Sequence, residues 1–167
     1  MRALRVFAWV AGSSVAVALL LYAMRYEIAR MQEGLPGFTH TLGYEYSEMV
    51  KMHDGVPLAT SIHLPDGEGS FPTVLIRSPY ARFEAVLRDQ VCGRFVRYGY
   101  ACVFQDTRGQ GDSGGVWDPG NNEIQDGRDT LDWLVRQDFQ NGNIGMMGPS
   151  YLTLNQYAAA AAGLPSQ

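Results

Sequence analysis

The residues best suited to do chemistry lie at positions 148–151 (GPSY), between a run typical of a buried strand and a run typical of a helix. A serine placed there is typical of a nucleophile elbow, in which a sharp strand-to-helix turn exposes the serine at the carboxyl edge of a sheet. Gly148 lets the strand and the helix approach each other without a clash at Cβ. The helix amino terminus behind Ser150 offers free N–H groups and a positive dipole end to a developing oxyanion. The pattern therefore indicates acyl transfer through Ser150.

This local string is a weak signal by itself. The full elbow pattern is G-x-S-x-G, and Leu152 stands where the last glycine would be. The alternative is that the Ser150 hydroxyl caps the following helix, because serine is a preferred N-cap residue. The choice between the two depends on the rest of the chain.

Hydrophobic patterning predicts an α/β domain after the first 44 residues. Two loosely alternating segments, separated by a turn signal at 53–55, predict a pair of antiparallel strands. Three continuous apolar runs predict strands buried on both faces, and helical periodicity follows each of them. The predicted strands are 46–52, 58–64, 73–76, 100–104 and 144–147, and the predicted helices are 83–96, 124–135 and 151–162. This alternation predicts a mostly parallel sheet.

Four short strings occupy the ends of these predicted elements. They are RSPY at 77–80, QDTRGQGDSGG at 105–115, DGRDTLDWL at 126–134 and GNIGM at 142–146, which leads into GPSY. In this order they make residues 45–163 similar to the cocaine esterase and X-Pro dipeptidyl-peptidase-like (CocE/NonD-type) family of serine hydrolases. α-Amino-acid ester hydrolases and glutaryl cephalosporin acylases resemble the same group.

The resemblance implies an α/β-hydrolase fold and cleavage of an ester, amide or peptide bond in a small-molecule substrate. It makes Ser150 the acylated nucleophile. It makes the backbone N–H of Tyr151 and the phenol of Tyr80 the oxyanion donors, and a tyrosine hydroxyl can serve because it donates one hydrogen bond while neutral. It implies neither a metal nor a cofactor.

One departure from the family concerns the elbow helix. Thr153 stands where the family pattern G-x-S-Y-x-G has glycine. A β-branched residue at this position is expected to push the helix away from the strand.

The larger departure concerns the catalytic partners. Hydrolases of this fold supply the acid and the histidine after the serine, yet His40, His53 and His63 all precede Ser150, and no Asp or Glu follows it. We therefore expect residues 45–167 to be the amino-terminal part of an α/β-hydrolase domain, truncated after the elbow helix and inactive alone. The alternatives are a non-catalytic remnant that binds ligands or partners, and a membrane-tethered adaptor.

The other polar and aromatic residues near these strings have structural interpretations. Arg77, Asp106 and Arg108 are expected to hold loops together by ion pairing rather than to touch substrate. Trp133 is expected in the core, and His53 and His63 are expected to be structural or solvated. Cys92 and Cys102 are too few for a disulfide framework and lack zinc-site spacing, so they are expected to be small buried hydrophobes.

The amino-terminal segment has the composition of a membrane span. Residues 6–24 contain no charged side chain, and a helix of this length extends about 28 Å, close to the hydrocarbon thickness of a bilayer. We expect residues 1–30 to be an uncleaved anchor, with a cleaved signal peptide or a buried core helix as alternatives, and residues 31–44 to be a linker. The arginines slightly favour a cytoplasmic amino end and an extracytoplasmic domain.

Composition limits the remaining function classes. The chain has 167 residues, of which 46% are hydrophobic and 18% charged, as in one globular domain rather than a disordered chain. Its formal net charge of −4 argues against nucleic acid as a partner, because phosphate binding needs clustered cations.

Overall fold

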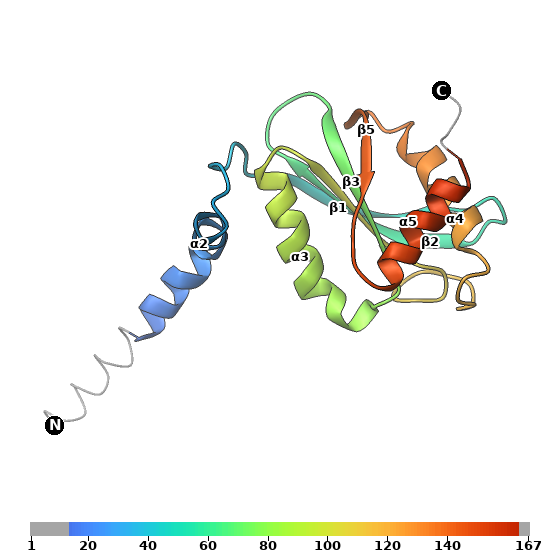
Figure 1. The fold of residues 1–167 in the computed structure, drawn as a ribbon, viewed down its shortest axis with the longest axis horizontal. Helices are drawn as coiled ribbons and strands as arrows, with labels where there is room; N and C mark the ends of the chain where they lie inside the picture. The colour runs from blue at the N-terminus through green and yellow to red at the C-terminus, as the bar shows by residue number, and fades with distance from the viewer. Residues whose placement is uncertain (1–13, 164–167) are drawn as a thin grey trace, which may run out of the picture. The chain divides into compact units, whose positions relative to one another are not determined.

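The computed structural model describes residues 14–163, apart from the side chains of residues 81–87. The chain divides into two compact units, Met1–Gly37 and Phe38–Gln167. In the first unit, residues 14–23 are helical and α2 (Arg25–Gln32) follows them (Figure 1). The helix α2 thus enters the segment predicted as a linker.

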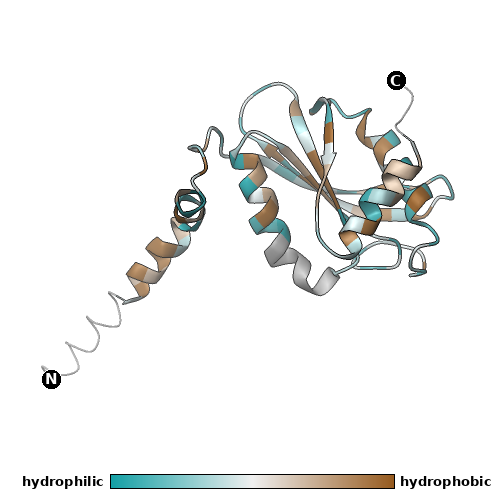
Figure 2. Cartoon of the chain, in the orientation of Figure 1, coloured by the Kyte–Doolittle hydropathy of each residue, from teal (hydrophilic) through white to brown (hydrophobic). Residues whose placement is uncertain are grey.

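The predicted membrane span lies partly outside the described residues. Within residues 14–163, no helix is long and apolar enough to cross a membrane, but residues 6–13 of the predicted span fall outside that range. The described part is strongly apolar (Figure 2), and its exposed side chains include Val15, Val17, Leu19, Leu20 and Leu21. The anchor therefore stays a prediction.

The second unit is built on a five-stranded sheet with the strand order β1-β2-β4-β3-β5 (Figure 1). Its strands are β1 (Leu42–Lys51), β2 (Pro57–Pro65), β3 (Phe71–Ser78), β4 (Ala101–Asp106) and β5 (Gln140–Met146). The strand β2 is antiparallel to both β1 and β4, whereas β4, β3 and β5 run parallel. The predicted α/β architecture is confirmed, although β1 begins at Leu42, inside the predicted linker.

Helices cover both faces of this sheet (Figure 1). They are α3 (Ala81–Arg97) on one face, and α4 (Glu123–Leu134) and α5 (Tyr151–Ala161) on the other. Because successive strand residues face opposite sides, Leu75 of β3 lies in the same core cluster as Leu131 of α4. Its neighbour Ile76 lies in the cluster that contains Cys92 of α3. Trp133 packs against the first cluster, as predicted.

The prediction for the cysteines is wrong in one respect. Cys92 and Cys102 are fully buried, as expected, but they form a disulfide. Cys92 lies on α3 and Cys102 on β4, and these two elements pack against each other. Sequence patterning missed the bond because the proximity arises only when the helix folds back over the sheet.

The strand β5 is not the fully buried strand that its apolar run predicts. It lies at one edge of the sheet, and its residues are exposed or half-buried. Among the described strands only β3 pairs with it, so its other edge is open. A continuous apolar run does not distinguish a central strand from an edge strand.

Candidate active site

Ser150 occupies a strained turn between β5 and α5. Its φ of 58° makes it the only non-glycine residue with positive φ in the described chain. Such a conformation costs on the order of 1–3 kcal/mol and persists only where the surroundings fix it. The hydroxyl makes no capping hydrogen bond to α5. The N-cap alternative is therefore wrong, and the geometry is that of an elbow.

The close approach of strand and helix at this turn requires Gly148. Its φ is +133°, and a Cβ on it would lie 2.3 Å from the Leu152 side chain. Thr153 does not separate α5 from the sheet, because its hydroxyl donates to the Gly148 carbonyl at 2.9 Å. Farther along α5, the Asn155 amide donates to the carbonyl of Arg77 on β3 at 2.8 Å. The helix therefore stays packed on the sheet despite the β-branched residue.

Tyr80 meets Ser150 at the carboxyl edge of the sheet. The Tyr80 hydroxyl donates to the Ser150 hydroxyl at 3.1 Å, and the backbone N–H of Tyr151 donates to the Tyr80 hydroxyl at 3.4 Å. Tyr80 is held in turn by its own N–H, which donates to the Ser78 hydroxyl at 3.2 Å. The structure thus brings together the three residues singled out from the sequence.

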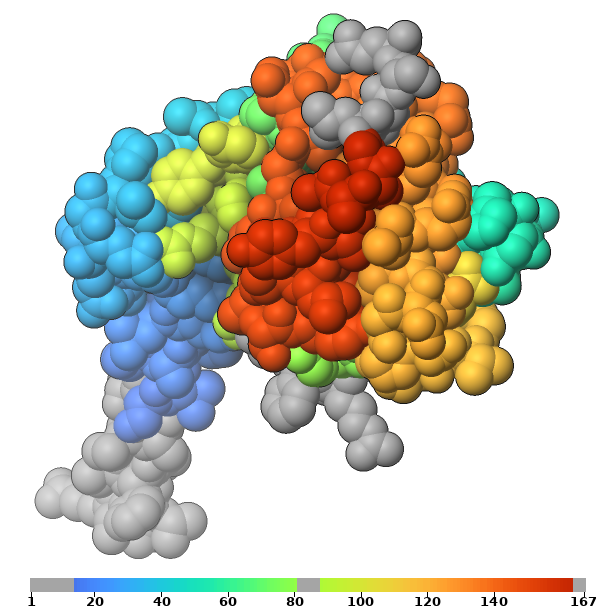
Figure 3. Space-filling model, turned by 45° about the vertical axis from the view of Figure 1, so that its right-hand side comes forward, coloured from blue at the N-terminus to red at the C-terminus, as the bar shows by residue number. Residues whose placement is uncertain are grey.

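The side chain of Tyr151 connects the elbow to α4 and to the loop before it. Its phenol donates to the Glu123 carboxylate at 2.5 Å and accepts from the Gly120 N–H at 3.0 Å. The Trp117 ring lies 5.1 Å from the Tyr151 ring, centroid to centroid. Burial, followed by the hydrogen bond to Glu123, raises the pKa of Tyr151 to about 12. Figure 3 shows the segment that includes α4 packed directly against α5.

Arg77, Asp106 and Arg108 support loops, but only Arg108 does so by ion pairing. Its guanidinium lies 2.7 Å from Asp54 and 2.6 Å from Asp126. The fully buried Arg77 donates to Gln105 at 2.9 Å and to the Glu123 backbone carbonyl at 3.3 Å, and burial lowers its pKa. Asp106 accepts from the Asp112 N–H at 3.0 Å. Among the described side chains neither Arg77 nor Asp106 forms an ion pair, so the prediction is wrong for these two residues, which act through hydrogen bonds.

The histidines have partners away from Ser150. His53 Nδ1 lies 2.8 Å from the Asp129 carboxylate, and the buried His63 lies 3.6 Å from Glu45. His40 pairs with the Thr39 hydroxyl at 2.8 Å. In the described part of the chain no histidine hydrogen-bonds to Ser150, and no cluster of His, Cys, Asp or Glu could hold a metal. A general base for Ser150 therefore does not come from these three residues in this arrangement.

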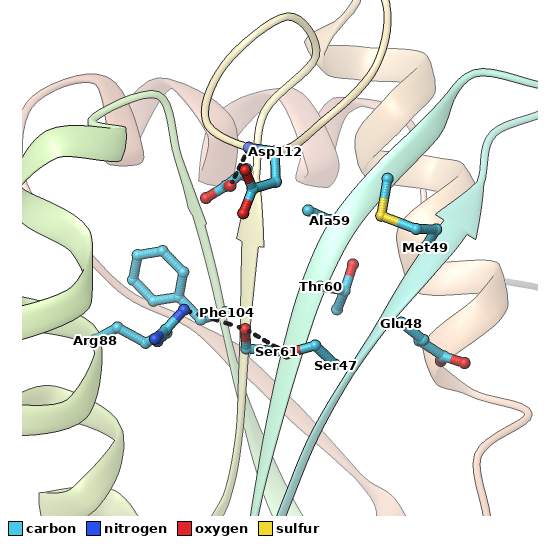
Figure 4. A pocket seen from close by; sticks show the side chains of 10 residues that line it. Ser47, Glu48, Met49, Ala59, Thr60, Ser61, Arg88, Phe104 and Asp112 are labelled. Atoms are coloured by element: carbon cyan, nitrogen blue, oxygen red, sulfur yellow. Dashed lines mark hydrogen bonds between the residues drawn. The ribbon is translucent and has the colours of Figure 1, made fainter.

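Two cavities of the second unit are lined by residues other than Tyr80, Ser150 and Tyr151. One of about 210 Å³ lies where α3 approaches β1, β2 and β4, and there the Arg88 guanidinium points to the Ser61 hydroxyl (Figure 4). A larger one of about 890 Å³ is lined by residues of β5 together with residues of β3, α4 and α5. Neither is lined by Tyr80, Ser150 or Tyr151.

Comparisons with known proteins add to this geometry. The family profile described as X-Pro dipeptidyl-peptidase (S15 family) matches residues 54–166. The chain is 42% identical over 119 residues to the cocaine esterase of Rhodococcus sp. (strain MB1 Bresler). The aligned region covers 70% of this chain and 21% of that protein.

Solved structures of hydrolases are also similar to this chain. An α-amino acid ester hydrolase labelled with selenomethionine is similar with a TM-score of 0.63 and 33% identity, over 73% of this chain and 24% of that one. A CocE/NonD family hydrolase from Staphylococcus aureus is similar with a TM-score of 0.62 and 26% identity, over 71% and 25%. The chain thus spans about a quarter or less of the length of these relatives.

Proposed function

Because the chain belongs to the X-Pro dipeptidyl-peptidase (S15) family, we propose that it supplies the nucleophile and the oxyanion donors of a serine hydrolase. The substrate is an ester, an amide or a peptide of small-molecule size, cleaved through an acyl-enzyme at Ser150. The observation that carries this proposal is the hydrogen bond from Tyr80 to the hydroxyl of Ser150 at a strained elbow.

We propose a role for each of the three residues. The Ser150 oxygen attacks the substrate carbonyl carbon while its proton passes to a general base, and the carbonyl oxygen becomes an oxyanion. The Tyr80 hydroxyl rotates its hydrogen from Ser150 to that oxygen, and the oxyanion replaces the Tyr80 hydroxyl oxygen as the acceptor of the Tyr151 N–H. Collapse of the tetrahedral intermediate expels the alcohol or amine, and water then releases the acyl group from Ser150.

The test uses the longest polypeptide that the gene encodes. It is assayed on p-nitrophenyl acetate, p-nitrophenyl butyrate and an X-Pro p-nitroanilide, beside its Ser150→Ala variant. We expect product release that depends on Ser150. Equal release by both proteins would instead favour the non-catalytic remnant or the adaptor.

We also propose that residues 6–24 anchor the protein in a membrane, with the hydrolase domain on the extracytoplasmic side. The exposed apolar side chains of residues 14–23 support the anchor. The disulfide between Cys92 and Cys102 supports the location, because disulfides persist mainly in oxidising compartments. Carbonate extraction of expressing cells should leave the full chain in the membrane pellet and release a form lacking residues 1–30. Full-length chain in the soluble fraction, or a mature amino terminus near residue 25, would contradict the anchor.

A further inference from the structure

We propose that Glu123 is a positioning residue for the elbow: its buried carboxylate holds Tyr151 by the phenol and thereby fixes the direction of the Tyr151 backbone N–H. This inference rests on the proposed function, because the direction of the Tyr151 N–H matters only if that N–H is an oxyanion donor. Glu123 itself would not touch the substrate. Sequence patterning singled out neither Glu123 nor the Tyr151 side chain for this task.

Three residues of the segment 117–123 hold the side chain of Tyr151. Glu123 is only 3% exposed, and it accepts the short 2.5 Å hydrogen bond from the Tyr151 phenol. The N–H of Gly120, in the loop before α4, donates to the same phenol oxygen, and the Trp117 ring packs against the Tyr151 ring. A tyrosine held at its ring and at its hydroxyl has little freedom to rotate, so its backbone is held too.

The site can keep a carboxylate buried because two positive features face it. Glu123 is in the first turn of α4, where the helix dipole favours a negative charge. The buried guanidinium of Arg77 donates to the backbone carbonyl of Glu123 and interacts electrostatically with its carboxylate. A buried charge that is hydrogen-bonded and compensated in this way is expected to keep one orientation.

The residue that follows the nucleophile needs such a support. Ser150 has a strained backbone, and strain of this kind relaxes unless the neighbouring residues hold it. If Tyr151 turned, its N–H would leave the position from which it can bond an oxyanion, and the Ser150 turn would relax with it. Misplacement of a catalytic group by about 1 Å can cost on the order of 10²-fold in rate.

A double-mutant cycle on Glu123 and Tyr151 tests the inference. The variants Glu123→Ala, Tyr151→Phe and the double variant are made in the longest polypeptide that the gene encodes. The readout is the rate of Ser150 phosphonylation by a fluorophosphonate, in which the Oγ–P bond forms, fluoride leaves and the hydroxyl proton passes to a base. Glu123→Gln retains an acceptor for the phenol and serves as the conservative variant. Asp126→Asn is the matched control, because Asp126 is an equally buried acid of α4 whose partner is Arg108.

We expect Glu123→Ala and Tyr151→Phe each to slow phosphonylation about 10- to 100-fold. The double variant should be no slower than either single variant, because both remove the same contact. Glu123→Gln should recover part of the rate, and Asp126→Asn should lower the melting temperature without changing the rate. A wild-type rate for Glu123→Ala, or independent effects that multiply in the double variant, would overturn the inference.

A second measurement separates this inference from the proposed function. If Ser150 of the wild-type protein does not react at all, the proposed function fails. Whether Glu123 holds Tyr151 in place is then tested by the NMR signal and the deuterium exchange of the Tyr151 backbone amide. A shifted signal and faster exchange in both single variants support the inference, and an unchanged amide overturns it.

Discussion

The hydroxyl of Tyr80 lies 3.1 Å from the hydroxyl of Ser150, although the two residues are 70 positions apart in the sequence. Tyr80 follows β3 and Ser150 follows β5, and these strands are parallel neighbours in the sheet. Their carboxyl ends therefore open onto the same edge, where α/β folds place their ligands. The strand order places the two loops at the same edge, and the elbow at Ser150 and the Tyr80–Ser78 hydrogen bond then bring the two hydroxyls together.

Removal of the Tyr80 hydroxyl should remove an oxyanion donor and leave the fold intact. We predict that Tyr80→Phe lowers kcat by about 10²–10³-fold with little change in KM, because the lost hydrogen bond is stronger in the transition state than in the ground state. Steady-state kinetics on p-nitrophenyl butyrate measure this split. Tyr100→Phe is the control, since Tyr100 precedes β4 at the amino-terminal end of that parallel strand; an equal loss in both variants would refute the donor role.

Residues 1–167 alone should show no ester turnover that depends on Ser150. The reason is that in the described chain the polar partners of the His40, His53 and His63 rings are Thr39, Asp129 and Glu45, and none of these histidines hydrogen-bonds to Ser150. The purified 167-residue chain is compared with Ser150→Ala on p-nitrophenyl acetate and butyrate. Turnover at ordinary enzymatic rates by the unmodified chain would mean that another of its residues acts as the base.

The fold was predictable from local patterns, whereas the site depended on the resemblance to a known family. Alternating and continuous apolar runs located the strands, because burial on one or both faces leaves such patterns. The GPSY string indicated an elbow because Gly148 fits a sharp strand-to-helix turn, but the string alone was a weak signal and the resemblance to a serine hydrolase family decided between the elbow and an N-cap. Tyr80 was found through its resemblance to a family string rather than from any local pattern.

Acidic solution should remove the stabilisation that Asp54 provides. The hydrogen bond from the Arg108 side chain, followed by one from the Val56 N–H, lowers the pKa of Asp54 from 3.8 to about 2. A lowered folded-state pKa stabilises the protein above the unfolded-state pKa, and this stabilisation is lost as the pH falls toward 2. We predict that Asp54→Asn is less stable than the wild type at pH 6 and that the difference shrinks by pH 2. Urea unfolding at a series of pH values measures it; a constant difference would contradict the lowered pKa.

Reduction of the disulfide should destabilise the second unit. Because Cys92 and Cys102 close a loop with a sequence separation of 10, the bond is expected to contribute about 2–3 kcal/mol to the free energy of unfolding. Urea unfolding with and without reductant measures this difference. A thiol assay on the denatured, unreduced protein provides the check: it should detect no free thiol, and two thiols per chain would disprove the bond.

Other features could not be predicted because they depend on packing between distant segments. The disulfide needs α3 to lie on β4, and the Glu123–Tyr151 contact needs α4 and α5 to lie side by side. Neither arrangement leaves a periodic trace in the sequence. A glutamate in the first turn of a helix is so common that only the fold gives this one a partner.

The most direct test of the account is to trap the acyl group on the protein. The longest polypeptide that the gene encodes is mixed with p-nitrophenyl acetate, quenched in acid within the first turnover and mapped by peptide mass spectrometry. We predict one acetyl group on Ser150, absent from the Ser150→Ala variant and strongly reduced in Tyr80→Phe. An acetyl group only on another residue such as Lys51, or equal labelling of the Ser150→Ala protein, would contradict the assignment of Ser150 as the nucleophile.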